Sequence, residues 1–364
     1  MANNLYVHFP FCRRRCSYCA LYSRTGVPQA DREAYVRRLL SELRQSRDLK
    51  SDDLTTVYFG GGSPALCDLT PLKDVLSSLL PRSPSPVPHE FTVELHPQDV
   101  TEAKLVELKS LGVNRISMGV QSLDDATLSD MGRGYTVDEA ERAFALVRKH
   151  FDNVGIDLIV GYPGDEVGDK VERKGGGGDG KSARRGTWNL GRLAGWGLKH
   201  CSVYSLQNER GLKNVPDDNV VLDRLRQIAK FLESIGLERY EISNFAVPGC
   251  ECRHNLAVWR GEDYVGLGEG ACGRIGLKRT VGRKTGIEES EVTPEFDLKE
   301  RAFFRLRTRE GLDAASLRTL PSFSSVCAAL DRNVVAGLLE RDGLVYRLTE
   351  RGTEVCDSIL ADLV

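Results

Sequence analysis

Three cysteines near the start of the chain have a spacing that suits a metal cluster. Cys12, Cys16 and Cys19 lie within the stretch CRRRCSYC, in the pattern CxxxCxxC, just past an apolar run. A loop of this size can wrap a cubane [4Fe–4S] cluster and supply thiolates to three of its four irons. The fourth iron then keeps an open position, which a metal centre that binds a substrate needs. The spacing therefore predicts a [4Fe–4S] cluster with one open iron.

A zinc site is the competing interpretation of these thiols. Structural zinc is normally closed by four ligands, and no fourth Cys or His lies at a zinc-like spacing, since His8 belongs to the preceding apolar run. The other cysteines are scattered, and incidental thiols are the default for them: Cys67, Cys201, Cys250, Cys252, Cys272, Cys327 and Cys356. The first residues lack a basic start and a long apolar run, so we expect a reducing, cytoplasmic location.

The composition of the chain is that of a globular protein and argues against nucleic-acid binding and a membrane span. The chain has 364 residues, of which 41% are hydrophobic and 28% charged, as in ordinary globular proteins. Its formal net charge of -2 gives no basic field, so we expect no nucleic-acid partner. No run of about 18 apolar residues is present to span a membrane, although docking to a membrane protein needs no such span.

Short β-rich runs alternate with amphipathic stretches over the first two thirds of the chain. The predicted strands are Leu5–Phe11, Thr56–Phe59, Glu90–His96, Arg115–Val120, Val154–Gly161 and Cys201–Leu206. The predicted helices are Ala30–Asp48, Leu69–Leu80, Glu102–Leu111, Val137–His150, Trp188–Leu198 and, after the last strand, Asn219–Ile235. Strands and helices that alternate at this spacing predict right-handed βαβ units and a parallel sheet.

Six such units are too few for an eight-stranded barrel, so a six-unit partial (β/α) barrel or an open sheet is expected. In either case ligands gather at the carboxyl ends of the strands. Residues 165–186 are rich in Gly, Lys and Arg without periodicity, which predicts a flexible insertion. From Pro294 the pattern changes to helices, a short hairpin and a closing helix, which predicts a small winged-helix-like domain. The expected division is a core at 1–215, an extension that completes the site at 216–293, and an end domain at 294–364.

The cysteine loop after the first strand resembles the signature of the radical S-adenosylmethionine superfamily. Within it, the chain is similar to the branch that holds HemW-type heme chaperones and oxygen-independent coproporphyrinogen III dehydrogenases. The stretches that carry the resemblance are LYVHFPFC at 5–12, FGGGSP at 59–64, ELHP at 94–97, NRISMGVQS at 114–122, GIDLIVGYPG at 155–164, YEISNF at 240–245 and RHN at 253–255. They cover almost the whole chain outside the insertion.

The resemblance implies that S-adenosylmethionine lies on the open iron, with its methionine end against the glycine-rich end of the second strand. The residues expected there are Gly61, Gly62 and Ser63, where missing side chains let backbone groups approach a ligand. Glu94, at the end of the third strand, could bind ribose hydroxyls. A plain tight turn is the competing interpretation of the glycines.

Further nucleotide-site residues follow from the same resemblance. Gln121, Arg133 and Asp157 lie at or just beyond the fourth and fifth strand ends, and Arg133 suits bidentate pairing with a carboxylate. Tyr6 and Tyr18 flank the cluster loop and match nucleotide-contacting positions, although either could be a packing residue. Taken singly, each of these polar residues could equally well have a structural role. Because they occur together in the same order as in the family, a role in binding is favoured.

The chain departs from its family at four positions. Leu21 stands where the dehydrogenase branch has a further cysteine, as an apolar residue does in HemW-type proteins. Val258 replaces a tyrosine of the family's His-Asn-x-x-Tyr-Trp stretch, Tyr135 replaces a histidine, and Cys272 stands where the family has histidine. Because histidine and thiolate are usual heme-iron ligands, these losses bear on how heme is handled.

His254 remains the expected axial ligand of a heme, with Cys272 a speculative second. The competing interpretation is a structural histidine that only makes hydrogen bonds, which is the commoner role for a lone histidine.

We therefore expect a HemW-like protein that binds a [4Fe–4S] cluster, S-adenosylmethionine and heme. The expected partners are an electron donor and a heme-acceptor protein, for which a respiratory membrane protein is the candidate class. The alternatives are an oxygen-independent coproporphyrinogen III dehydrogenase, which Leu21 disfavours, and a radical enzyme with another substrate.

Overall fold

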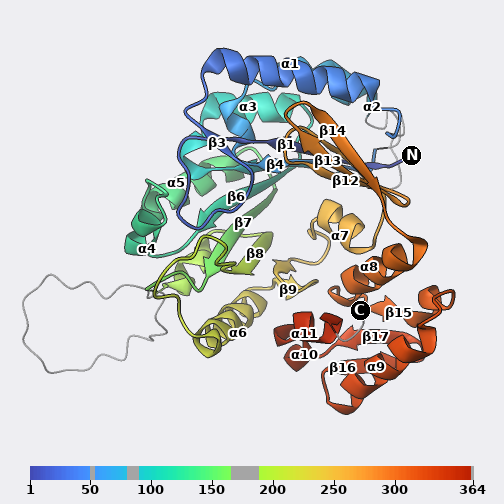
Figure 1. The fold of residues 1–364 in the computed structure, drawn as a ribbon. Coiled ribbons are helices and arrows are strands. Elements are labelled where there is room, and N and C mark those ends of the chain that lie inside the picture. Colours follow the sequence, from blue (N-terminus) through green and yellow to red (C-terminus); the bar gives the residue numbers. More distant parts are fainter. Residues whose placement is uncertain (50–53, 80–89, 165–187, 362–364) are drawn as a thin grey trace, which may run out of the picture.

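The computed structural model describes residues 1–49, 54–79, 90–164 and 188–361, and one 12-stranded sheet dominates it (Figure 1). The strand order is β14-β13-β12-β11-β1-β4-β5-β6-β7-β8-β10-β9. A second sheet of three strands, in the order β15-β17-β16, belongs to the C-terminal part of the chain. The insertion predicted at 165–186 lies outside the described residues.

Six parallel strands form the middle of the large sheet. They are β1 (Asn4–Phe9), β4 (Thr56–Gly61), β5 (Glu90–Leu95), β6 (Arg115–Gln121), β7 (Asn153–Val160) and β8 (His200–Ser205). Each pairs in parallel with the next one along the chain, as repeated right-handed βαβ units require. The sheet confirms the predicted α/β core of six repeating units.

Helices connect these strands and cover the outer face of the sheet (Figure 1). They are α1 (Gln29–Gln45), α2 (Lys73–Leu79), α3 (Glu102–Ser110), α4 (Asp125–Asp130), α5 (Val137–Arg148) and α6 (Asp218–Ser234). A capping box between Thr136 and Glu139 fixes the start of α5. Within the described ranges, no helix is long and apolar enough to cross a membrane.

The prediction of an α-helix at Trp188–Leu198 is wrong. Leu190–Gly195 forms a 3₁₀ helix instead. Gly191, Gly195 and Gly197 interrupt this stretch, and each glycine costs an α-helix about 1 kcal/mol relative to alanine. Tighter 3₁₀ turns are usual for such short connecting pieces.

Residues 238–291 continue the same sheet at both edges. Their elements are β9 (Glu238–Arg239), β10 (Asn244–Ala246), α7 (Arg253–Trp259), β11 (Tyr264–Leu267), β12 (Cys272–Ile275), β13 (Lys278–Arg283) and β14 (Gly286–Glu291). β11 pairs in parallel with β1, whereas β12 to β14 continue antiparallel and β10 pairs antiparallel with β8. Neither these strands nor α7 were predicted from the sequence; β13 is mostly half-buried and β14 is exposed throughout.

The C-terminal residues build a separate small domain with its own apolar core. Its elements are α8 (Pro294–Leu306), β15 (Leu312–Asp313), α9 (Phe323–Val335), β16 (Leu339–Asp342), β17 (Val345–Leu348), α10 (Glu350–Glu354) and α11 (Cys356–Ala361). This arrangement confirms the predicted helical domain with a hairpin.

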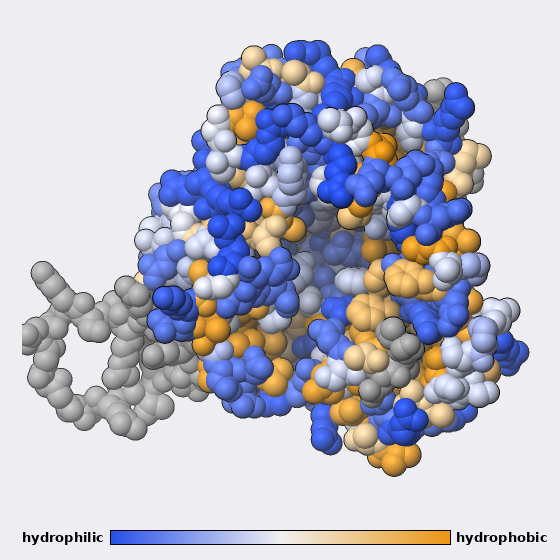
Figure 2. Space-filling model, in the orientation of Figure 1, coloured by the Kyte–Doolittle hydropathy of each residue, from blue (hydrophilic) through white to orange (hydrophobic). Residues whose placement is uncertain are grey.

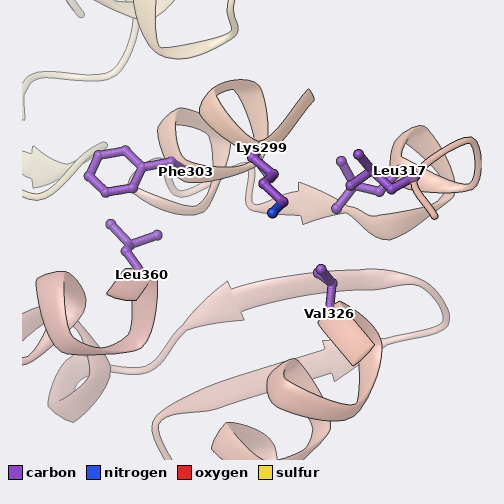
Figure 3. Close-up of a pocket in the computed structure, with 7 residues that line it drawn as sticks. Lys299, Phe303, Leu317, Val326 and Leu360 are labelled. Carbon is purple, nitrogen blue, oxygen red and sulfur yellow. The ribbon is translucent and has the colours of Figure 1, made fainter. Parts of the chain in front are cut away.

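One small cavity lies inside the C-terminal domain. Lys299, Phe303, Leu317, Val326 and Leu360 are among the residues that line it (Figure 3). Its volume of about 10 Å³ is room for a single water molecule, so it is not a site for an organic ligand.

The inner face of the parallel strands is polar. Tyr6 on β1 stacks on Tyr58 on β4, and the Tyr58 hydroxyl donates a hydrogen bond to Glu94 on β5 at 2.8 Å. Ser117 on β6 donates to Asp157 on β7 at 3.1 Å. The space-filling view shows the molecule hollowed near the middle of this face, between the parallel strands and the extension (Figure 2). A polar hollow in the sheet is where a charged ligand can be held.

Candidate functional site: the cysteine loop and the strand ends around it

The cluster loop, residues 12–19, leaves the sheet directly after β1. β2 (Phe11–Cys12) pairs with β3 (Arg24–Thr25), which closes the chain excursion at its base. Inside the loop, the backbone N–H of Cys19 donates to the carbonyl of Cys16 at 3.3 Å. All three thiols are free and half-buried. The loop therefore presents them at the carboxyl end of the first strand, where the sequence predicted a binding site.

Two of the three thiols, Cys12 and Cys19, have pKa values above the ordinary value. Burial, together with the neighbouring thiols of Cys19 and Cys16, raises the pKa of Cys12 to about 11. Burial also raises the pKa of Cys19. The Cys12 and Cys19 thiols are therefore protonated at neutral pH, and a metal that binds them must displace their protons.

Contacts from the rest of the barrel hold the loop. The backbone N–H of Ser17 donates to the carbonyl of Met131 at 3.1 Å, and its hydroxyl lies 2.8 Å from the hydroxyl of Tyr162. Arg13 makes an ion pair with Asp99, whose carboxylate is 2% exposed. Residues from three other segments, Asp99 after β5, Met131 at the end of α4 and Tyr162 after β7, therefore fix the loop.

Gly62 packs closely against the base of the cluster loop. A Cβ atom on Gly62 would lie 2.5 Å from the carbonyl oxygen of Phe11 and 2.9 Å from the Cys12 sulfur, so only glycine fits there. In the part of the chain that the structure describes, no three His, Cys, Asp or Glu side chains surround one point closely enough for a single metal ion. A cubane needs no such point, because each thiolate binds a separate iron. The donor set and its spacing fit the cluster.

The end of β4 forms the neighbouring wall of the site. The backbone N–H of Gly61 donates to Glu94 at 3.0 Å, and Gly61 has a φ of 106°, which favours glycine. Ser63 donates to Asp99 at 2.5 Å, so the same carboxylate holds both this turn and the cluster loop. Burial and then the charge of Asp157 raise the pKa of Glu94 from 4.5 to about 7. Near neutral pH, Glu94 is therefore partly protonated and can either donate or accept a hydrogen bond.

The carboxyl ends of β6 and β7 bring the other predicted polar residues to the same side. Gln121 has a φ of 72° and lies where the pairing of β6 with β7 shifts register. Its amide nitrogen would be 2.6 Å from a Cβ atom on Gly119, so the bulge turns this side chain back over the strand end. Asp157 is held by Ser117, and burial raises its pKa.

Arg133 connects the strand ends with the cluster loop. The guanidinium is 6% exposed, donates to the carbonyl of Gly119, and lies 3.5 Å from the Cys16 sulfur and 3.4 Å from the Tyr18 hydroxyl. Its Nε donates to the hydroxyl of Tyr135 at 2.9 Å. Tyr135, where the family has histidine, thus positions Arg133.

Tyr6 lies deeper in the hollow than the loop. Its hydroxyl is 3.1 Å from Nδ1 of His8, and the His8 Nε2 is 2.9 Å from the carbonyl oxygen of Tyr22. A Cβ atom on Gly61 would come within 2.5 Å of the His8 ring. His8 therefore supports both Tyr6 and the glycine turn.

His254 lies at the opposite end of the strands from the cluster loop. Its Nδ1 is 2.8 Å from Oγ1 of Thr56, the first residue of β4, which pairs with Asn4 at the start of β1. The cluster loop departs after Phe9, at the other end of β1. The structure thus separates His254 from the cluster loop, while the ring of Tyr6, a predicted nucleotide residue, lies 6.3 Å from the His254 ring.

Hydrogen bonds assign the tautomer of His254. The Asn4 amide nitrogen donates to the carbonyl of Asp263 at 3.1 Å, so its oxygen accepts the Thr56 hydroxyl proton at 2.8 Å. Thr56 then accepts the Nδ1 proton of His254, and Nε2 carries a lone pair. Burial and the charge of Arg115 lower the pKa of His254 to about 3, so the ring is neutral.

Two residues of the site were not predicted. Asp99 joins Arg13 to Ser63, and His8 supports Gly61. Asp99 lies just past the ELHP stretch and His8 lies inside a strand, so no local pattern marks either one. Their roles come from contacts between distant segments.

Comparison with known proteins places the chain in a family. The model of the radical SAM superfamily matches residues 6–172, and that of the HemN C-terminal domain matches residues 292–355. Heme chaperone HemW of Lactococcus lactis is 30% identical over 338 residues, covering 85% of this chain and 83% of that protein. The chain belongs to the HemW family of the radical SAM superfamily. The HemW protein of Bacillus subtilis is 29% identical and is matched over 98% of this chain and 99% of that protein.

A solved structure shares the architecture. Coproporphyrinogen III oxidase (HemN) from Escherichia coli, a radical SAM enzyme, superposes with a TM-score of 0.79 over 99% of this chain and 89% of that one, at 20% identity. The comparison confirms the radical SAM α/β fold with a C-terminal HemN-type domain. Membership of this superfamily implies a [4Fe–4S] cluster and S-adenosylmethionine as cofactors, which agrees with the donor set of the cluster loop.

Proposed function

We propose that the protein is a HemW-type heme chaperone that binds a [4Fe–4S] cluster, S-adenosylmethionine and heme, and passes heme to an acceptor protein. Relatives that carry the name heme chaperone HemW match it over 83%, 99% and 97% of their own length. Leu21, where the dehydrogenase branch has a cysteine, favours this assignment over coproporphyrinogen chemistry.

The observation that carries the cofactor part is the position of Arg133 between the cluster loop and the end of β6. Cys12, Cys16 and Cys19 would hold the cluster, which when bound supplies the electron that cleaves the sulfonium of S-adenosylmethionine. Arg133 would pair with a carboxylate of the nucleotide's methionine end, because a buried guanidinium binds carboxylates strongly.

The other residues of this wall would orient the nucleotide. Gly61, Gly62 and Ser63 leave room for its methionine part, Glu94 would accept ribose hydroxyls, and Gln121 and Asp157 would line the adjoining strand ends. Tyr6 and Tyr18 would close the site against water.

Heme ligation by His254 is supported by its chemical state. A neutral imidazole with a lone pair on Nε2 and an anchored Nδ1 proton is the usual form of a metal-binding histidine. The side chain is 4% exposed and stacks near Tyr6 and Tyr58. An iron can reach Nε2 only when these rings move apart, so we expect heme binding to be slow and to alter tyrosine fluorescence.

Heme titration tests this proposal. Anaerobically purified protein with reconstituted cluster is titrated with heme for wild type, His254→Ala and Thr56→Val, with His150→Ala as a surface control. We expect a saturable Soret band in wild type and His150→Ala, a shifted or lost band in His254→Ala, and weakening of about tenfold or more in Thr56→Val, because outer-shell partners of metal ligands have such effects. No saturable heme binding by wild-type protein with an intact cluster contradicts the chaperone proposal.

The remaining parts of the proposal concern where the protein acts and how its parts divide the work. The free state of all ten cysteines agrees with a reducing cytoplasm.

We assign the site to residues 1–215 together with the extension 216–293. We propose that the end domain, residues 294–364, contacts the acceptor, for which a respiratory membrane protein is the candidate class. Conversion of coproporphyrinogen III to protoporphyrinogen by the purified protein would instead establish the dehydrogenase.

A further inference from the structure

The turn between β11 and β12 carries a buried carboxylate, Glu269, to which the proposed function gives no role. Its side chain is 3% exposed. The backbone N–H of Glu269 donates to the hydroxyl of Tyr35 on α1 at 3.0 Å, and that hydroxyl donates to the carbonyl of His8 on β1 at 2.8 Å. These bonds fix the turn between α1 and β1 without any contact from the Glu269 side chain.

Glycines on both sides of Glu269 let the turn approach the cluster loop closely. Gly268 has a φ of 91°, and a Cβ atom there would lie 2.7 Å from the carbonyl oxygen of His8. Gly270 has a φ of 88°, and a Cβ atom there would lie 3.0 Å from the Cβ of Tyr22. Tyr22 belongs to residues 20–25, which follow Cys19 and which we call the return leg of the cluster loop. The turn therefore packs directly against the return leg.

The two oxygens of the Glu269 carboxylate contact two different segments. Oε2 accepts a hydrogen bond from the Tyr22 hydroxyl at 2.8 Å and lies 3.6 Å from Nη1 of Arg24, both in the return leg. Oε1 accepts a hydrogen bond from Nη2 of Arg38 on α1 at 2.9 Å. Arg38 also donates to the carbonyl of Lys284, between β13 and β14, which Figure 1 shows beside α1. One oxygen thus holds the cluster loop and the other holds the helix.

The contact with Tyr22 is a strong one for an exposed side chain. Burial acts to raise the pKa of Glu269, yet the hydrogen bonds from Tyr22 and Arg38 hold it below its usual value, so the carboxylate is ionised at neutral pH. Hydrogen bonds to an ionised acceptor are roughly twice as strong as neutral ones. Tyr22 is 47% exposed, so this bond and not burial of the ring determines where its hydroxyl lies.

The return leg has few contacts that could replace this one. His8 Nε2 lies 2.9 Å from the carbonyl oxygen of Tyr22, and β3 pairs with β2 at the base of the loop. Both contacts come from residues that directly precede or begin the cluster loop. Glu269, by contrast, belongs to the extension, more than 240 residues away in the sequence. It ties the loop to a part of the molecule that does not move with the loop itself.

We propose that Glu269 is a positioning residue for the [4Fe–4S] cluster. By holding Tyr22 and Arg24 against the β11–β12 turn, it fixes the return leg and with it Cys19, three residues before Tyr22. This inference rests on the cluster part of the proposed function. Because coupling between two sites is reciprocal, a bound cluster that orders the return leg must also stabilise the β11–β12 turn.

Four variants of the full chain test the inference. Glu269→Gln weakens both contacts, Tyr22→Phe removes only the hydrogen bond from the loop, and Arg38→Gln removes only the contact from α1. Glu288→Gln is the matched control, since it neutralises an exposed carboxylate of the same extension. Each protein is reconstituted anaerobically and analysed for iron and sulfide. The rate at which bathophenanthroline disulfonate strips the cluster is then followed by absorbance, and amide hydrogen exchange of residues 264–275 is measured with and without the cluster.

We expect the cluster to slow hydrogen exchange at residues 264–275 in wild type and in Glu288→Gln. In Glu269→Gln and Tyr22→Phe the cluster should be stripped about tenfold faster, because partners outside the ligand shell have effects of this size, and loading should no longer slow the exchange. Arg38→Gln should melt at a lower temperature, because Arg38 also stacks on Tyr35, and should keep a stripping rate close to that of wild type.

Two results would overturn the inference. One is wild-type iron content and an unchanged stripping rate in both Glu269→Gln and Tyr22→Phe. The other is faster stripping in Arg38→Gln than in Tyr22→Phe, which would mean that Glu269 acts only through the stability of the fold. If Glu269→Gln does not fold, Tyr22→Phe decides alone, because its side chain is half exposed. A wild-type protein that takes up no cluster would instead contradict the proposed function, and this inference with it.

Discussion

Arg133 illustrates how single side chains join distant segments in this site. Its guanidinium contacts Cys16 and Tyr18 of the cluster loop and the carbonyl of Gly119 on β6, and Tyr135 fixes its Nε. A buried guanidinium in this position can pair with an anion held between the loop and the strand end. The residue can thus assist cluster binding and nucleotide binding at once.

The glycine under the cluster loop gives a direct test of the close packing. Gly62→Ala would place a methyl group 2.5 Å from the Phe11 carbonyl oxygen and push Cys12 out of position. We expect loss of most of the cluster absorption and a destabilisation of about 1–3 kcal/mol, as overpacked sites show. Iron analysis and urea unfolding measure the two effects. Gly195→Ala is the control, since a Cβ there meets nothing within 4 Å; equal iron content in the two variants would contradict the packing argument.

Glu94 should make stability depend on pH. The pKa of Glu94 is about 7 in the folded protein and 4.5 in the unfolded chain. Between pH 4.5 and 7, the folded protein therefore keeps a proton on Glu94 that the unfolded chain has released. Wild-type stability therefore falls relative to Glu94→Gln as pH rises from 4.5 to 7, by at most about 3 kcal/mol. Thermal melts from pH 4.5 to 8 measure the difference, with Glu102→Gln as an exposed control. Parallel curves for wild type and Glu94→Gln would show that Glu94 ionises normally.

At the scale of elements, α7 is held by a carboxylate from another part of the chain. Glu90, the first residue of β5, accepts hydrogen bonds from the backbone N–H groups of Arg253 at 3.0 Å and His254 at 3.1 Å. These are the first two residues of α7, whose own cap residue, Cys252, makes no side-chain cap. An acid at a helix N-terminus also meets the positive end of the helix dipole.

Replacing this carboxylate should loosen α7. Glu90→Gln leaves one acceptor oxygen for two buried N–H donors, so one donor is unpaired at a cost of about 1–3 kcal/mol. Chemical unfolding measures the loss. Glu251→Gln, which removes a charge from an exposed hydrogen bond to Gly249, should change stability little. Equal stability of the two variants would mean that α7 does not depend on Glu90.

The elements that the sequence predicted well are those whose pattern is local. Apolar runs marked all six parallel strands, and the CxxxCxxC spacing marked the cluster loop. The strands β9 to β14 were all missed, because β9 to β12 are only two to four residues long and β13 and β14 lack an apolar run. The roles of Asp99 and Glu90 could not be predicted, because each depends on contacts with segments far away in the chain. The separation of His254 from the cluster loop likewise follows only from strand register.

At the scale of the whole molecule, a buried ionic network joins the sheet extension to the end domain. Asp297 on α8 accepts hydrogen bonds from Arg274 on β12 at 2.5 Å, Arg279 on β13 at 2.7 Å and Arg301 on α8 at 2.8 Å. Burial acts to raise the pKa of Asp297, yet the hydrogen bonds from Arg279 and Arg301 hold it below its usual value. Stability from this group is lost as pH falls through that lowered pKa.

Neutralising the carboxylate of Asp297 should uncouple the sheet extension from the end domain. Asp297→Asn leaves the guanidinium of Arg274, 2% exposed, without its closest counter-charge, and breaking such buried pairs costs about 3–5 kcal/mol. Differential scanning calorimetry would show a lower or split transition. Glu295→Gln removes only an exposed pair with Lys299, for which the expected loss is below about 1 kcal/mol. A single unchanged transition in Asp297→Asn would contradict the coupling.

The position of β1 between β4 and β11 bears on the order of folding. The first strand of the chain gains its second neighbour only when residues 264–267 have been synthesised. Until then one edge of β1 has unpaired backbone groups, directly beneath the loop with the three cysteines. Contacts between residues so far apart in sequence close slowly. The cysteine loop is therefore completed late, and we expect iron and sulfide to be loaded only after residues 264–267 have left the ribosome, so that the apo-protein is exposed to oxidation and aggregation until then.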